Sequence, residues 1–230
     1  MTEKLFYLLQ VNDSLFPIGG YSHSQGLETY IQKGIVCDEK TAEEYILQKL
    51  KWSLTYTDLL AVRLAYEYSQ AEDIEGLLRL ESIIEASRLP EEQRDASRKM
   101  GSRFAKTVES LELAELKEGI FRRYMDGRKG RGVNHCCVYG VFCGAIGLEL
   151  DDTLSHYLYS QISAVVTNCV KTIPLSQTGG QKILAGCYRE MEEALKTVMT
   201  LSEEDLCLSA PGFDVRGMQH ESLYSRIYMS

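Results

Sequence analysis

The sequence predicts an all-α protein, and three observations carry this prediction. Apolar residues recur at steps of three and four along most of the 230 residues, which is the spacing of one face of an α-helix. We find no segment with the period-two alternation of a half-buried strand. With only four prolines and few turn dipeptides, the chain fits helices joined by short loops. We therefore expect a single domain over residues 1–230 that holds about nine or ten helices.

The N-terminal part of the chain is expected to hold seven of these helices. The apolar spacing places them at about residues 4–14, 24–33, 42–56, 58–70, 73–87, 91–111 and 115–125. Thr41-x-x-Glu44 has the pattern of a capping box for the third helix. Pro90, followed by two glutamates, is a typical first-turn signal for the sixth.

The C-terminal part contains the most apolar stretches. The uncharged run from Cys136 to Leu148 is too short to span a bilayer and predicts a buried helix. In it, Gly140 and Gly144 would let a neighbouring helix approach closely. A broad apolar stripe over residues 151–173 predicts the longest helix.

Capping signals mark the remaining boundaries. Asp151 is the expected N-cap of the long helix, and Pro174 ends it. Ser176 is the expected N-cap of the next helix, whose apolar face runs to Val198. Ser202-x-x-Asp205 has the pattern of a second capping box.

Three segments break the helical pattern. Residues 15–28 hold three glycines and a proline, residues 126–134 form a basic glycine-rich loop, and residues 208–230 form a tail with a Pro-Gly turn. The basic loop could bind an anion, but a mobile solvated connector is the better interpretation of such a charge run. The tail mixes aromatic, apolar and charged residues.

Composition excludes several classes of protein. The 25 basic and 33 acidic residues give a net charge of −8, so we expect no general affinity for nucleic acid or anionic membranes. The seven cysteines include no Cys-x-x-Cys pair and lack the spacing of a secreted disulfide framework. The first ten residues do not resemble a signal peptide. We therefore expect a cytoplasmic protein.

Nucleotide and metal sites are not expected. A phosphate-binding loop needs a Gly-Lys dipeptide, which the sequence lacks. His135 and the two cysteines after it are adjacent, so at most two of them can share a helix face. His220-Glu221 resembles the start of a zinc-protease motif, but Tyr224 stands where its second histidine belongs. We expect no cofactor and no stoichiometric metal ion.

The residues leave two functional questions open. An enzyme could be built around Tyr21, His23 and Glu28, although a serine that caps the next helix explains the Ser22-His23-Ser24 run equally well. Tyr and Arg residues in the tail are types that anchor protein interfaces. We expect the tail at 208–230 to be mobile in the free protein and to become ordered on a partner; the alternative is a last helix docked on its own core.

Five blocks of sequence, in order along the whole chain, resemble the UreF family of urease accessory proteins. They are Leu8–Gln10 with Phe16–Glu28, Arg94 with Gly101, His135 with Gly140, Pro174–Gln177 with Gly180–Leu184, and Met218–Ser230. Ser176 departs from the glycine common in this family, and Gln25 from a frequent aromatic residue or histidine. Neither departure affects a residue to which we assign a role.

The resemblance implies a non-enzymatic, all-α chaperone of nickel insertion into urease. Members of the family form homodimers and bind a UreD/UreH-type accessory protein, and together they recruit the GTPase UreG to apo-urease and regulate GTP-dependent release of nickel. By this resemblance the partner-binding residues are expected to be Tyr21, His23, Glu28, His220, Glu221, Tyr224 and Arg226, the last four in the tail at 208–230. A helical adaptor with an unrelated client is the remaining alternative.

Overall fold

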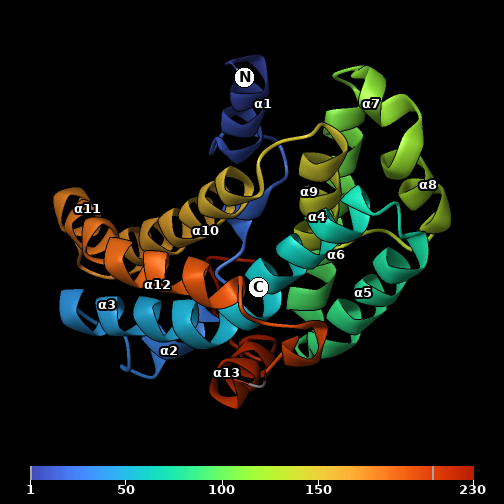
Figure 1. The fold of residues 1–230 in the computed structure, drawn as a ribbon. Coiled ribbons are helices and arrows are strands. Elements are labelled where there is room, and N and C mark those ends of the chain that lie inside the picture. Colours follow the sequence, from blue (N-terminus) through green and yellow to red (C-terminus); the bar gives the residue numbers. More distant parts are fainter. Residues whose placement is uncertain (1, 209) are drawn as a thin grey trace.

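The computed structural model describes residues 2–208 and 210–230, and these residues confirm the all-α prediction (Figure 1). The α-helices are α1 Thr2–Asn12, α2 Leu27–Gln32, α3 Glu39–Gln48, α4 Leu60–Gln70, α5 Ile74–Ser87, α6 Glu91–Glu109, α7 Ala114–Lys117, α8 Gly119–Gly127, α9 His135–Ala145, α10 Leu150–Thr172, α11 Gln177–Gly186, α12 Tyr188–Val198 and α13 Pro211–His220. The described residues also form two 3-10 turns, η1 Gly20–Ser22 and η3 Glu203–Asp205, and one π-helical segment, η2 Lys49–Leu59.

The predicted break between residues 56 and 58 does not occur. Instead, α3, η2 and α4 follow one another without a gap from residue 39 to residue 70, in a run that contains neither glycine nor proline. The N-cap of α3 is Asp38, whose carboxylate accepts a hydrogen bond from the Thr41 amide at 2.9 Å. The capping box is therefore formed by Asp38 and Thr41. It lies about one helical turn before the expected box of Thr41 and Glu44, which is wrong.

Two of the expected helices are each divided. The segment at 115–125 is interrupted at Gly119, whose φ of 79° lies in the left-handed region, so α7 and α8 are separate. The helix capped by Ser176, which accepts from the Gly179 amide as predicted, ends at Gly186 and is followed by α12. Glu149 rather than Asp151 occupies the N-cap position of α10. The capping box of Ser202 and Asp205 is confirmed, although it begins only a short 3-10 turn.

Helix α9 lies in the centre of the core. Every residue from His135 to Gly144 is buried, and the helix packs closely against α4 and α6. A Cβ added to Gly140 would lie 2.4 Å from the carbonyl oxygen of Val62 on α4. This close approach between backbones confirms the predicted role of Gly140.

The alanine variant of Gly140 should destabilise the protein strongly. Because the added methyl group would meet backbone atoms of α4, the two helices must separate, which typically costs about 1–3 kcal/mol or more. Urea unfolding followed by circular dichroism measures the effect. Gly34→Ala is a control without a steric clash, since a Cβ at Gly34 meets no atom within 4 Å, although its positive φ adds some strain of its own.

Figure 1 shows how the helices are arranged around this core. Helices α3, α10, α11 and α12 lie on one side of the view and α5, α7 and α8 on the other, with α4, α6 and α9 between them. Helix α13 lies at the bottom of the view, against α2 and α6. None of the described helices has the length and apolar character needed to cross a membrane. The buried apolar side chains form one continuous core.

Candidate interaction surface

The end of the chain folds back onto the loop before α2. The amide of Met229 donates to the carbonyl of Ser22 at 2.8 Å, and the carbonyl of Ser230 accepts from the amide of Gln25 at 2.8 Å. The Ser24 hydroxyl donates to the same carbonyl at 2.9 Å, and His23 Nδ1 lies 2.8 Å from the Ser230 hydroxyl. The tail is therefore joined mainly through backbone groups to the segment at 22–25.

Glu28 fixes the tail from the first turn of α2. Its carboxylate accepts the amides of Ile227 at 2.7 Å and Tyr228 at 2.9 Å. The Nε2 atom of His220 lies 3.2 Å from the same carboxylate. A buried carboxylate needs such hydrogen bonds to compensate for its lost hydration, and here two of the three come from the tail backbone.

His220 and Glu92 extend this network to α6. The Nδ1 atom of His220 lies 2.7 Å from Glu92, so each ring nitrogen of this buried histidine faces a carboxylate. The other oxygen of Glu92 pairs with the guanidinium of Arg226. Nearby, the carboxylate of Glu221 accepts the amide of Glu91 at 2.8 Å, which satisfies one of the free N–H groups at the start of α6.

Helix α13 brings His220 to this position by packing closely on α6. A Cβ at Gly217 would lie 2.6 Å from the Pro90 side chain, so only glycine fits this approach. The ring of Phe213 contacts those of Tyr30 and Tyr45. Pro211 occupies the first turn of α13, so the expected Pro-Gly turn is the start of a helix.

Burial lowers the pKa of several basic groups in and beneath this network. The pKa of His23 is lowered, first by burial and then by the positive charges of Lys99 and Arg103. Lys49 lies beneath α13, with its ammonium group 5.4 Å from the centre of the Phe213 ring, and burial lowers its pKa to about 8. In the core, burial lowers the pKa of His135 to about 4.

The seven expected partner-binding residues fall into two groups. His23, Glu28 and His220 are buried and are engaged with the chain's own tail or body. Tyr21, Glu221, Tyr224 and Arg226 are on the exterior. Arg226 is only about one third exposed at its side chain, at 36%.

The geometry does not favour the alternative of an enzyme at Tyr21, His23 and Glu28. The Tyr21 side chain is 75% exposed, whereas Glu28 is occupied by backbone amides of the tail. The N-cap of α2 is Gly26, so neither Ser22 nor Ser24 caps this helix as we expected. His23 and Glu28 instead hold the tail in place.

The docked tail and the loop beneath it leave several apolar side chains exposed. We call this set the tail surface: Tyr21, Met218, Tyr224, Ile227 and Met229. Tyr224 is fully exposed and Ile227 is 75% exposed. The tail is held mainly by backbone hydrogen bonds, so these side chains are free to contact a partner.

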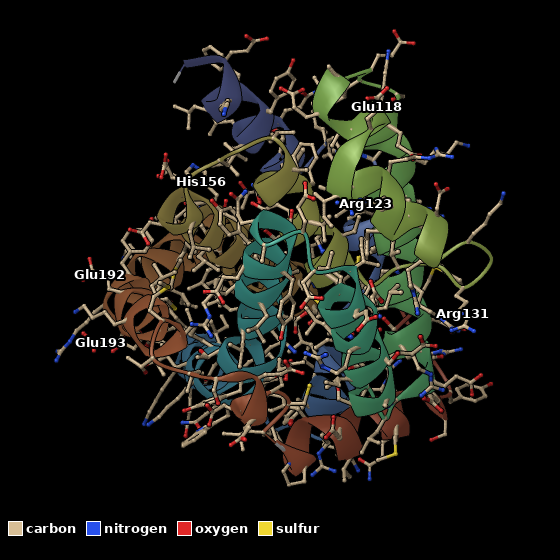
Figure 2. The ribbon with its side chains drawn as sticks, turned by 45° about the vertical axis from the view of Figure 1, so that its right-hand side comes forward. Glu118, Arg123, Arg131, His156, Glu192 and Glu193 are labelled. Atoms are coloured by element: carbon tan, nitrogen blue, oxygen red, sulfur yellow. The ribbon has the colours of Figure 1, made fainter. Side chains whose placement is uncertain are left out.

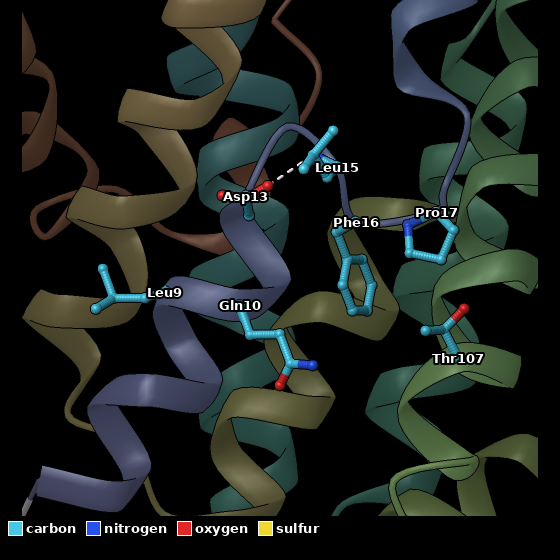
Figure 3. A pocket seen from close by; sticks show the side chains of 7 residues that line it. All are labelled: Leu9, Gln10, Asp13, Leu15, Phe16, Pro17 and Thr107. Atoms are coloured by element: carbon cyan, nitrogen blue, oxygen red, sulfur yellow. Dashed lines mark hydrogen bonds between the residues drawn. The ribbon is translucent and has the colours of Figure 1, made fainter.

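A second apolar feature lies between α1 and α6 (Figure 3). It is a shallow pocket of about 460 Å³ lined by Leu9, Gln10, Asp13, Leu15, Phe16, Pro17 and Thr107. The amide of Leu15 donates to the Asp13 carboxylate at 2.7 Å and turns the chain over the pocket. The Leu15 side chain is exposed.

The basic loop at 126–134 is anchored, which corrects the expectation of a solvated connector. Arg128 is buried, and its guanidinium donates to the Gly132 carbonyl at 2.9 Å and lies 3.2 Å from Glu85. Buried Glu81 accepts the Asn134 amide at 3.0 Å. Lys129 and the rest of the loop crest remain exposed.

Glu92 links His220 to Arg226 in the tail network, and the sequence interpretation missed this role. It was considered only as part of a helix-start signal after Pro90. An acidic residue in the first turn of a helix needs no further explanation, so the sequence gives no sign that Glu92 pairs with residues 128 and 134 positions away.

Among the described residues, no group of three or more His, Cys, Asp or Glu side chains is arranged to hold a metal ion.

Comparisons with known proteins identify the family of the chain. A model of the UreF family matches residues 36–188. The chain is also 37% identical, over 229 residues and 99% of both chains, to a urease accessory protein UreF from Geobacillus kaustophilus (strain HTA426). The chain therefore belongs to the UreF family of urease accessory proteins.

Proposed function

We propose that the chain is a scaffold for urease maturation. In this proposal it acts in the cytoplasm with a UreD/UreH-type accessory protein, recruits the GTPase UreG to apo-urease and regulates GTP-dependent insertion of nickel, which is cargo and not a resident cofactor. Membership of the UreF family makes the chain an accessory protein and not an enzyme. The partners and their order of assembly are the proposed part.

The tail surface is the observation that carries this proposal. Exposed aromatic and apolar side chains at Tyr21, Tyr224 and Ile227 are costly to leave in water and are types that anchor interfaces. The network around Glu28 fixes the backbone beneath them, so little conformational entropy is lost when a partner binds. Tyr21, Tyr224 and Arg226, which we expect at the interface, thus lie on the tail or on the loop to which the tail is hydrogen-bonded.

The alanine variant of Tyr21 should weaken recruitment of the GTPase. Tyr21 lies on a short turn between Gly20 and Ser22, and its exposed ring can be buried by a partner. Loss of such an anchor typically costs about 2 kcal/mol or more in binding, with little effect on folding. Size-exclusion chromatography with UreG and the UreD/UreH-type protein measures recruitment.

A matched control is Tyr188→Ala, because Tyr188 is also an exposed tyrosine but lies on α12. This variant should behave as wild type. If Tyr21→Ala lowers the unfolding midpoint while leaving recruitment intact, Tyr21 is a structural residue and the proposed surface is misplaced.

The alanine variant of Arg226 tests the tail directly. Its partner Glu92 also faces His220, so we expect local loosening of the tail, a nearly unchanged unfolding midpoint, and loss of the ternary complex with the GTPase. A single, partly exposed ion pair near the end of the chain contributes little to global stability. An Arg226→Ala protein that still assembles the complex would contradict this assignment.

We also propose a homodimer, but not through α9. Helix α9 is buried along its length and offers no surface to a second copy. The proposal therefore rests on the family resemblance. Light scattering at tens of micromolar protein should give twice the mass of one chain, and a monomer would contradict it.

A further inference from the structure

Two basic segments that are distant in sequence converge on one side of the molecule. The first is the outer face of α6, which carries Lys99, Arg103 and Lys106 at intervals of about one turn. The second is the crest of the loop after α8, with Lys129 and Arg131. We call these five residues the basic surface.

The two segments are held side by side. A Cβ at Gly132 would lie 3.2 Å from the Ser102 hydroxyl and 3.9 Å from Cβ of Arg98, so the loop lies against α6. Buried Arg128 fixes the loop from below by bonding to the Gly132 carbonyl. Figure 2 shows the Arg131 side chain pointing outward from this loop.

The basic surface groups five positive charges that have no ion-pair partner in the part of the chain that the structure describes. All five side chains are exposed, and none forms an ion pair with another described residue, whereas Arg98 beside them is paired with Glu85 and Asp95. The whole chain carries a net charge of −8. A concentration of free positive charge on an acidic protein creates a local field of opposite sign.

This surface borders Tyr21. The guanidinium of Arg103 reaches over the loop and lies 3.5 Å from the Ile18 carbonyl, and Met100 contacts the position of Gly20. The positive charges of Lys99 and Arg103 are also felt at His23, whose pKa they help to lower. The basic surface therefore borders the loop that carries Tyr21.

We propose that the basic surface docks a carboxylate-rich face of the GTPase that Tyr21 anchors. This inference rests on the proposed function and adds the chemistry of the partner: acidic side chains facing α6 and the loop at 128–131. Charge complementarity favours a protein partner, since the overall negative charge of the chain opposes a long polyanion. Arg103 positions the Tyr21 loop, while the four other residues steer the partner.

The test uses charge reversal in pairs on the full-length protein. Lys99→Glu with Lys106→Glu reverses the helix part, and Lys129→Glu with Arg131→Glu reverses the loop part. The control pair is Lys171→Glu with Lys182→Glu, two exposed lysines of α10 and α11 that also form no ion pair with a described residue. Each pair changes the net charge equally. Arg103 is left intact because it contacts the Tyr21 loop.

We expect each basic-surface pair to slow association with the GTPase, in the presence of the UreD/UreH-type protein, by about tenfold at low salt. The control pair should change the rate by less than about threefold, the effect of net charge alone. For wild type the association rate should fall steeply as salt rises, and this dependence should be weaker in the variants. All proteins should keep the wild-type unfolding midpoint.

Several outcomes separate this inference from the proposed function. If Tyr21→Ala weakens GTPase binding but both basic pairs match the control pair, the inference is overturned and the proposed function stands. If the basic pairs slow association while Tyr21→Ala has no effect, the inference stands and the Tyr21 anchor is wrong. If wild type binds a single-stranded DNA oligomer and only the basic pairs abolish that binding, with GTPase association unchanged, the surface serves nucleic acid and the inference fails.

Discussion

Replacing Glu28 by alanine should release the tail from the body of the protein. Its carboxylate is the acceptor for the amides of Ile227 and Tyr228 and faces His220. Each lost bond to a buried charged group is worth about 1.5–3 kcal/mol, so the docking equilibrium of the tail should shift by about a hundredfold or more. Hydrogen exchange of residues 222–230 should accelerate by that factor, while exchange in α9 should not change.

Glu221→Ala is the matched control for this experiment. Its carboxylate is exposed and accepts a single bond, from the amide of Glu91, so exchange in the tail should rise only slightly. Fast exchange of 222–230 already present in the wild-type free protein would contradict the docked tail. That result would restore the idea of a tail that becomes ordered only on its partner.

Acid should destabilise the protein through His135. Burial lowers the pKa of His135 from 6.5 to about 4, so the unfolded chain binds a proton before the folded one as the pH falls. Stability is therefore complete above pH 6.5 and decreases between pH 6.5 and about 4. The loss at the lower end is about 3 kcal/mol, at about 1.4 kcal/mol for each unit of pKa.

The variant His135→Phe isolates this effect from the titration of carboxylates. Phenylalanine retains the ring contacts with Phe104, Tyr139 and Tyr157, and the buried Nε2 atom of His135 has no hydrogen-bond partner in the described part of the chain. The difference in unfolding free energy between variant and wild type should grow in favour of the variant by about 3 kcal/mol from about pH 7 to about pH 4. Parallel pH curves would contradict this expectation, because they would mean that the pKa of His135 is the same in the folded and the unfolded chain.

The fold could be predicted from the sequence because helical periodicity is a local property. The apolar stripes located α9 and α10 closely, and Ser176 was correctly identified as an N-cap. The continuous run from α3 to α4 was missed because a π-helical segment at 49–59 shifts the apolar spacing and resembles a break. Caps were misplaced where a neighbouring residue, such as Asp38, could serve equally well.

The candidate site was less predictable because its contacts join distant parts of the chain. The resemblance pointed to residues at 21–28 and 220–226, yet nothing local indicates that Glu28 lies under the tail backbone or that Glu92 pairs with both His220 and Arg226. Sequence alone also could not separate buried network residues from exposed ones. The basic loop illustrates the same limit, because buried Arg128 forms ion pairs with Glu81 and Glu85 of α5, far from it in the sequence.

The central claim, that the chain is a scaffold for the GTPase, is tested most directly by co-expression with the UreD/UreH-type protein and UreG, followed by size-exclusion chromatography with light scattering. The account predicts that the chain elutes with the UreD/UreH-type protein, and that UreG joins this complex only when both are present. Tyr21→Ala should remove UreG and leave the other two together. The account would be contradicted if the chain eluted apart from both proteins, or if the UreD/UreH-type protein bound as much UreG without the chain as with it. Either result would favour a helical adaptor with another client.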